Sequence, residues 1–286
     1  MTEIRVLQPG DEAAVEAFLL PRIETSMFLL GNMRAAGLVD RGEHLHGTYA
    51  AAFEGGEMVA VVAHYWNDNL IVQAPVRIGA LCRAAVEASG RGIDGVIGPA
   101  AQVQEARDAL DLSRDAIQLD QTEYLYSLDL VDLIVPEGLR SGRLVGRRIG
   151  PGDVEQVTAW LVAFGLESLG EEESPRLWSR TRASVEHRQA QGLIWILEDG
   201  GRPVSTGGFN TAIAEAVQIG GVYAPPELRG RGYGRAVVAA SLLDARAEGV
   251  GSSILFTGVE NVPAQRAYEA LGYRHIGDYR LLLLRG

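Results

Sequence analysis

The stretch ELRGRGYGRAVV, residues 227–238, alternates arginine and glycine before an apolar run. A strand-like segment, Val217–Tyr223, precedes it and ends at two prolines, and a helical pattern from about Tyr233 to Ala247 follows. The first N–H groups of a helix lack internal partners, and the helix macrodipole adds partial positive charge there. Glycines let an anion approach the main chain, and guanidinium groups suit phosphate oxygens. The stretch therefore predicts a pyrophosphate site at a helix N-terminus.

Two other phosphate loops do not fit this stretch. A Walker A loop needs a lysine, which is absent, and a Rossmann fingerprint needs a third glycine at position 235, which is arginine. Taken alone, the stretch is also compatible with a solvated helix-capping loop. The choice between these interpretations depends on the residues that follow.

The residues downstream complete a recognisable pattern. A strand is expected at Ser252–Gly258, then a helix from about Pro263 to Leu271, a glycine stop and a final strand. The residues that carry the pattern are Arg229, Gly232, Gly234, Asn261, Ala264, Tyr268, Gly272 and Tyr273. With them, the chain resembles the GNAT superfamily of acyl-CoA-dependent N-acyltransferases, close to its FR47-like branch. The resemblance is close over residues 219–284 and rests on element order alone over residues 145–221.

The resemblance implies acetyl-CoA as co-substrate. The end of the strand before the loop would pair with the pantetheine arm, and the loop would hold the pyrophosphate. A parting of this strand from the one at 252–257 would expose the thioester. The residues implied to bind acetyl-CoA are Val222, Tyr223, Ala224, Arg229, Gly230, Arg231, Gly232, Tyr233, Gly234, Arg235, Asn261 and Ala264.

Two residues are candidates for acid and base catalysis. The resemblance implies that Tyr268 is the general acid that protonates the leaving thiolate, although an apolar ring packed under its helix would also explain it. A base would be expected near Gln218 or Gly220, where the sequence has no acid. Glu260 is a weak base candidate, a solvated loop carboxylate is its alternative explanation, and a chain of waters would also serve.

The function implied is an N-acetyltransferase that transfers an acetyl group to a primary amine of a small molecule or peptide. The alternatives are a transferase that uses another acyl-CoA, or a non-catalytic acyl-CoA sensor or interaction module. The missing base favours the sensor.

An internal repeat divides the chain. RVLQPGDEAAVEAF, from Arg5, has an echo in RRIGPGDVEQVTAW, from Arg147, with their prolines and aspartates at one offset of 142 residues. Both copies predict a strand, a Pro-Gly turn, an aspartate as helix N-cap and a helix. Apolar runs broken by Gly-Gly at 50–63 and 194–208 predict a β-hairpin in each half. Duplication explains these matches, although such elements also recur by chance in α/β chains.

The predicted fold is α/β (α+β), with two GNAT-like domains, each a mixed, mostly antiparallel sheet flanked by helices. Residues 1–137 form a degenerate N-terminal domain, residues 143–286 the catalytic domain, and VPEGLRSGR at 135–143 the linker. The first half offers only Arg77 and Gly79 where the anion loop should stand, so we expect it not to bind CoA. It would act as a structural lid or as a wall of the acceptor pocket.

Composition sets the remaining expectations. A net charge of −11 and a pI near 5.0 disfavour nucleic-acid binding. The single cysteine, the absence of a signal-peptide pattern in residues 1–20 and apolar runs far too short to cross a bilayer predict a cytoplasmic protein without membrane association. His44 and His46 lack ligand partners at a zinc-like spacing, so no metal is expected.

Overall fold

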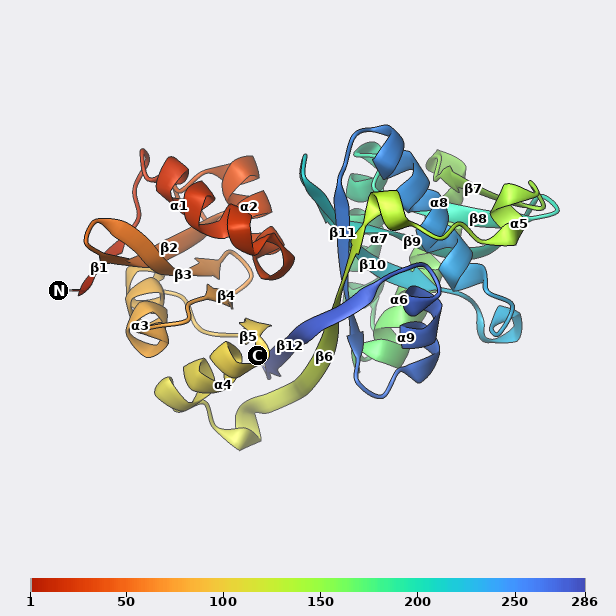
Figure 1. Ribbon diagram of the computed structural model, residues 1–286. Helices are drawn as coiled ribbons and strands as arrows, with labels where there is room; N and C mark the ends of the chain where they lie inside the picture. Colours follow the sequence, from red (N-terminus) through yellow and green to blue (C-terminus); the bar gives the residue numbers. More distant parts are fainter. Residues whose placement is uncertain (1, 286) are drawn as a thin grey trace. The chain divides into compact units, whose positions relative to one another are not determined.

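A computed structural model describes residues 2–285 and divides the chain into two compact units (Figure 1). Unit 1 comprises Met1–Leu125 together with Gly277–Gly286, and unit 2 comprises Tyr126–Ile276.

Unit 1 is a mixed sheet between two pairs of helices. Its elements are β1 (Thr2–Val6), α1 (Glu12–Leu19), α2 (Ile23–Ala36), β2 (Gly47–Glu54), β3 (Glu57–Tyr65), β4 (Asn69–Gln73), α3 (Ile78–Ser89), β5 (Gly95–Pro99), α4 (Ala100–Ala109), most of β6 (Ile117–Asp129) and the end of β12 (Arg274–Leu284). Strands β1 to β4 pair antiparallel, β4 and β5 parallel, and β5 and β12 antiparallel. Figure 1 shows α1 and α2 on one side of these strands and α3 and α4 on the other. Because side chains alternate along a strand, Tyr49 bonds to Leu29 of α2 while Ala50 packs with α3.

Unit 2 repeats this plan. Its elements are the end of β6, α5 (Glu137–Arg140), β7 (Leu144–Arg148), α6 (Val154–Ser168), α7 (Pro175–Ala190), β8 (Ile194–Asp199), β9 (Arg202–Ala212), β10 (Ala216–Tyr223), α8 (Tyr233–Ala247), β11 (Ser252–Gly258), α9 (Val262–Glu269) and the start of β12. Strands β7 to β10 pair antiparallel, and β10 pairs parallel with β11. Ile194 and Ile196 pack with Val157 of α6, whereas Trp195 between them donates to Asp244 of α8 at 2.7 Å. The predicted mixed sheet flanked by helices is confirmed in both units.

The boundary between the units differs from the sequence prediction of domains at 1–137 and 143–286. The chain passes from unit 1 to unit 2 within β6 and returns within β12. The last strand belongs to unit 1 because Tyr279–Leu283 pair with β5. The Pro- and Gly-rich stretch taken as a linker lies inside unit 2, where it forms α5. Both crossing points lie inside continuous strands, and Gly277 at the second one does not interrupt β12, so composition does not reveal them.

The repeated segments make the same contacts in both units. Arg5 donates through two nitrogens to Asp11, both at 2.7 Å, and Arg147 donates to Asp153 at 2.6 and 3.0 Å. Each aspartate stands at the N-cap position, but neither side chain caps its helix, contrary to the prediction. Each accepts instead from the turn N–H three residues earlier, at 2.9 and 2.8 Å. The arginine forks occupy the carboxylates, so these residues lock strand to turn.

The two predicted Gly-Gly hairpins are also present. The turn glycines of β2–β3 have φ of +61° and +87°, and those of β8–β9 have φ of +60° and +76°. Both hairpins are therefore closed by turns that need left-handed backbone, and each has a register shift near its end. Matching turns and irregularities support the duplication.

Replacing Asp11 by asparagine is expected to reduce stability in a pH-dependent way. The hydrogen bonds from Arg5 lower the pKa of Asp11 to about 2. A carboxyl with a depressed pKa stabilises the fold above its unfolded pKa and loses that effect as pH falls through its folded pKa. Because Arg5 is partly exposed, we discount the effect to about 1 kcal/mol, or roughly 2–4 °C in Tm near pH 7. Thermal unfolding from pH 7 to pH 2.5 should show this difference shrinking below pH 4, and a constant difference would contradict it.

Candidate functional site

The strands β10 and β11 separate partway along their length. Their parallel pairing runs from Ala216↔Ser252 to Ile219↔Leu255, whereas β10 continues to Tyr223 and β11 to Gly258. On its other side β10 has a register shift against β9 between Gly220 and Tyr223, and Gly221 has a φ of +62°. A bulge of this kind bends a strand and increases its twist. The paired register with β11 ends at Ile219, so main-chain groups at the end of β10 lie outside the β11 ladder.

The loop after β10 leads directly into the N-terminus of α8. Gly230 and Gly232 have φ of +76° and +78°, a left-handed backbone that other residues adopt at a cost. Gly232 is the N-cap residue, and no side chain caps the helix. The first hydrogen bond of the helix runs from the Ala236 N–H to the Gly232 carbonyl at 3.0 Å. No side chain caps the preceding N–H groups, which is the arrangement in which a helix N-terminus can accept an anion.

Two arginines of the loop lie beside this N-terminus. Arg231 is exposed and donates to the Glu227 carbonyl at 3.3 Å. Arg235 is half-buried, and its Nη2 lies 3.6 Å from a Cβ built on Gly232. Its Nε is inaccessible and has no hydrogen-bond partner among residues 2–285. An unsatisfied guanidinium N–H at an uncapped helix N-terminus fits a phosphate ligand.

The third loop arginine is held away from the glycines. Arg229 pairs with Glu167 of α6 at 2.6 Å, donates to the Ala224 carbonyl at 3.0 Å and lies 5.4 Å from the centre of the Tyr223 ring. The Tyr223 hydroxyl donates to the same glutamate at 3.0 Å. The Glu167 hydrogen bond raises the pKa of Arg229, and burial, followed by the bond to Glu167, raises the pKa of Tyr223. Sequence reasoning missed Glu167, because a contact across some 60 residues leaves no local pattern.

Replacing Glu167 by glutamine should loosen this loop. The pair is partly exposed, so its loss is expected to speed amide hydrogen exchange at residues 229–232 only a few-fold. Glu186→Gln, which breaks a pair with Arg182 on the exposed face of α7, is the matched control and should leave these amides unchanged. Unchanged exchange in Glu167→Gln would show that the glutamate does not order the loop.

The side chain of Tyr233 is bonded to the end of β8, so only its main chain is available at the start of α8. The buried hydroxyl donates to Asp199 at the end of β8, at 2.7 Å, and Arg143 pairs with the same carboxylate at 2.6 Å. The Tyr233 hydrogen bond, together with Arg143, lowers the pKa of Asp199. The ring therefore anchors the first turn of α8 to the sheet.

Tyr268 lies on α9, which follows β11. Its side chain is buried, with its ring centre 6.0 Å from that of Tyr273 in an edge-on arrangement. The Tyr273 hydroxyl is 2.6 Å from the Ser253 hydroxyl on β11, and burial raises its pKa. The aromatic pair thus fixes α9 against the strand that parts from β10.

The turn between β11 and α9 holds two further candidates. Asn261 accepts a hydrogen bond from the Ala264 N–H at 3.2 Å, which makes it the N-cap of α9. Both Asn261 and Glu260 are exposed. Asn261 therefore positions the helix that carries Tyr268, and Glu260 stands at the open end of β11.

Comparison with known proteins identifies this region. Residues 154–273 match the family model described as Acetyltransferase (GNAT) family. The GNAT family model therefore covers most of unit 2 and somewhat less than half of the chain. A curated relative named mycothiol acetyltransferase, from Nocardia farcinica, is 27% identical over 187 residues, which cover 61% of this chain and 57% of that protein. The chain thus matches little more than half the length of this relative.

Solved structures share the fold over the whole length of the chain. A GCN5-related N-acetyltransferase from Sphaerobacter thermophilus has a TM-score of 0.61 at 16% identity and covers 100% of this chain and 96% of its own. A tandem GNAT protein from the clavulanic acid biosynthesis pathway has a TM-score of 0.56 at 15% identity, covering 99% and 98%. The tandem arrangement expected from the repeat is thus found in a solved GNAT structure.

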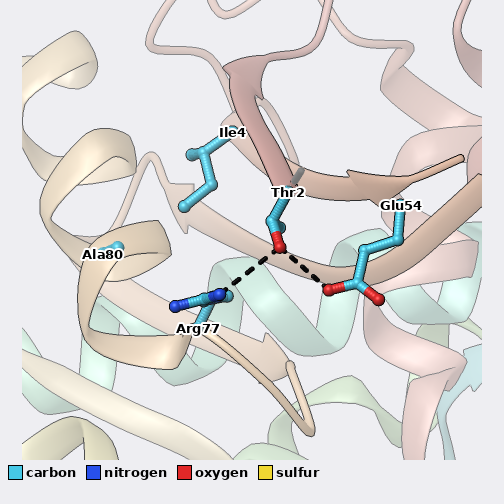
Figure 2. A pocket seen from close by; sticks show the side chains of 5 residues that line it. All are labelled: Thr2, Ile4, Glu54, Arg77 and Ala80. Atoms are coloured by element: carbon cyan, nitrogen blue, oxygen red, sulfur yellow. Dashed lines mark hydrogen bonds between the residues drawn. The ribbon is translucent and has the colours of Figure 1, made fainter. Parts of the chain in front are cut away.

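In unit 1, the corresponding helix start is built differently from that of the GNAT domain in unit 2. The N-cap of α3 is Arg77, with a φ of +61°, and its Nη2 donates to the Thr2 hydroxyl at 3.4 Å. Thr2 donates in turn to Glu54 at 2.9 Å, and Figure 2 shows this chain of bonds at a surface pocket of about 600 Å³ that Ile4 and Ala80 also line. A Cβ on Gly79 would lie only 2.6 Å from the Ala109 Cβ. Packing of α3 against α4 therefore explains this glycine.

The described part of the chain shows neither a cluster of metal ligands nor a membrane-spanning helix. Residues 2–285 contain no cluster of three or more potential metal ligands among histidine, cysteine, aspartate and glutamate. None of the helices in the same range is long and apolar enough to cross a membrane.

Proposed function

We propose that unit 2 transfers the acetyl group of acetyl-CoA to a primary amine of a small molecule or peptide. The observation that carries the proposal is the parting of β10 and β11 beside an uncapped α8 N-terminus. A parted strand offers main-chain groups to an extended ligand, and the helix start offers N–H groups to its phosphates. Acetyl-CoA has an amide-containing arm and a pyrophosphate in that order.

The proposed reaction needs three contributions from this chain. A neutral amine attacks the thioester carbon, a C–N bond forms, and main-chain N–H groups at the end of β10 support the developing oxyanion. The C–S bond then breaks, and Tyr268 gives its proton to the leaving thiolate. The attacking nitrogen loses a proton to water or to Glu260. CoA and the N-acetylated amine leave.

Support for acetyl as the group transferred comes from the name of the curated relative, which is an acetyltransferase. A second candidate function is acyl-CoA binding without transfer. It is favoured by the strand β10 itself, AVQIGGVY, which has no acid, and whose Gln218 is buried and donates to the Ile219 carbonyl at 2.9 Å.

For unit 1 we propose a GNAT-like domain that does not bind CoA. Arg77 rather than glycine stands at its helix start, and Gly79 serves helix packing.

The experiment is a thermal-shift series with acetyl-CoA, CoA and longer acyl-CoAs. A ligand that binds only the folded state at about 100 times its Kd adds about 2.7 kcal/mol. A shift with acetyl-CoA supports the proposal. A larger shift with a longer acyl-CoA would indicate that the longer acyl group is the one transferred. No shift with any CoA would overturn the proposal.

A further inference from the structure

Arg188 lies in the last turn of α7 and has no counter-charge. Burial lowers the pKa of its guanidinium to about 10, so it stays charged at neutral pH. Its Nε is inaccessible and has no hydrogen-bond partner among residues 2–285. In the same described range, no carboxylate forms an ion pair with it. By contrast, Arg180 of the same helix pairs with Glu171, just before it, and Arg182 pairs with Glu186.

The fold does not account for a charge at this position. Taking an ion out of water is costly unless partners replace the water. The C-terminal end of a helix attracts a nearby cation only weakly. Within residues 2–285 the guanidinium donates to the Phe209 carbonyl on β9, 3.2 Å from Nη2. The side chain is half-buried, and in the same range Nη1 makes no hydrogen bond, so it remains for another acceptor.

The guanidinium lies at the bulge of β10. Its Nη1 is 3.9 Å from a Cβ built on Gly221, the bulge residue with a φ of +62°. A Cβ built on Gly221 would also lie 3.2 Å from the Leu161 side chain of α6. Arg188 therefore approaches β10 on the face that α6 and α7 cover. The side chain of the next residue, Val222, lies on the α8 face instead, 3.4 and 3.5 Å from Cβ atoms built on Gly207 and Gly234. The glycine-rich loop 229–234 thus lies on one face of the sheet where β10 and β11 separate, and Arg188 lies on the other face.

We propose that Arg188 binds a carboxylate of the acceptor, so that the substrates are amines that carry a carboxylate, of the amino-acid class. The inference rests on the proposed function, which puts the thioester where β10 and β11 part. A planar guanidinium matches a planar carboxylate with two parallel hydrogen bonds. A phosphate dianion would call for further cations, and the described contacts of Gly221 include only this one. The carboxylate would accept hydrogen bonds from guanidinium N–H groups that the Phe209 carbonyl leaves unused.

The test compares matched acceptors. Each of the twenty amino acids and its amide is offered with acetyl-CoA, and thiol release gives kcat/KM for both. A hydrogen bond to a charged group contributes about 1.5–3 kcal/mol, so the wild type should prefer the acid over the amide by at least about tenfold for its best acceptor.

The variant Arg188→Gln retains a donor for the Phe209 carbonyl and removes the charge. It should bring the ratio of acid to amide close to one, with the KM for acetyl-CoA unchanged, and Arg188→Lys should restore part of the preference. Arg182→Gln, on the exposed face of the same helix, is the control and should keep the wild-type ratio. Thermal unfolding of each variant confirms that it is folded.

Each other outcome is decisive. An unchanged acid preference in Arg188→Gln, or equal use of acids and amides by the wild type, would overturn the inference while leaving the transferase intact. If acetyl-CoA binds but no amine is acetylated, calorimetry measures binding of the same acids and amides to the acetyl-CoA complex. Selective binding of the acids that is lost in Arg188→Gln supports the inference. Binding without that selectivity overturns it. If no acetyl-CoA binds, the proposed function and this inference fall together.

Discussion

Replacing Tyr268 by phenylalanine is expected to lower the kcat for amine acetylation by about 100-fold or more, with little change in the KM for acetyl-CoA. General acid catalysis contributes typically 10²–10⁴-fold, and the substitution removes only the hydroxyl. The ring stays in its buried place against Tyr273, so the fold and the parted strands should be preserved. Steady-state thiol release at saturating amine measures the effect.

Tyr273→Phe is the matched control for this prediction. It removes a buried hydroxyl from the same aromatic pair and leaves Ser253 without its partner, so the free energy of unfolding should fall by about 1 kcal/mol. Its kcat should stay close to that of the wild type. A Tyr268→Phe enzyme with full kcat would show that Tyr268 is a packing residue and that the proton comes from elsewhere.

Replacing Gly232 by glutamate is expected to weaken acetyl-CoA binding by roughly 100-fold, or about 3 kcal/mol. The glycine is the N-cap of α8, where a carboxylate would lie among the N–H groups proposed to hold the pyrophosphate. The new charge would repel the phosphates and occupy the helix N-terminus itself. Isothermal calorimetry with acetyl-CoA measures the change in Kd.

Strain alone must be separated from charge in this experiment, because Gly232 has a φ of +78°. Gly249, just after α8, has a φ of +93° and no neighbouring atom within 4 Å of a built Cβ. Gly249→Glu therefore adds the same side chain at a similar backbone cost but at the other end of the helix. It should keep the wild-type Kd, and an equal loss of affinity in both variants would argue against a pyrophosphate at the loop.

Local patterns predicted the elements around the loop closely. The helix Tyr233–Ala247 and the strand Ser252–Gly258 have the bounds that the sequence indicated, because apolar periodicity and glycine punctuation act over a few residues. The left-handed glycines of the loop and hairpins follow from the same local rules. The predicted mixed sheets and tandem plan were confirmed for this reason.

The sequence did not predict contacts between segments that are distant along the chain. Arg229 was expected to face a phosphate, yet its side chain pairs with Glu167 on α6. The last strand was assigned to the second domain, but its pairing with β5 places residues 277–286 in unit 1. Arg188 packs half-buried beside Gly221, and a sequence does not show which arginines pack against a sheet. Tertiary packing decides all three.

Whether the protein is an amine acetyltransferase is tested by the rate of thiol release from acetyl-CoA, measured for the purified protein with and without a panel of primary amines. We expect slow release without an amine. At least one amine should raise the rate to steady turnover, with one N-acetylated product per thiol. Tight binding of acetyl-CoA with no amine-dependent release across the panel would contradict this expectation and leave an acyl-CoA-binding protein.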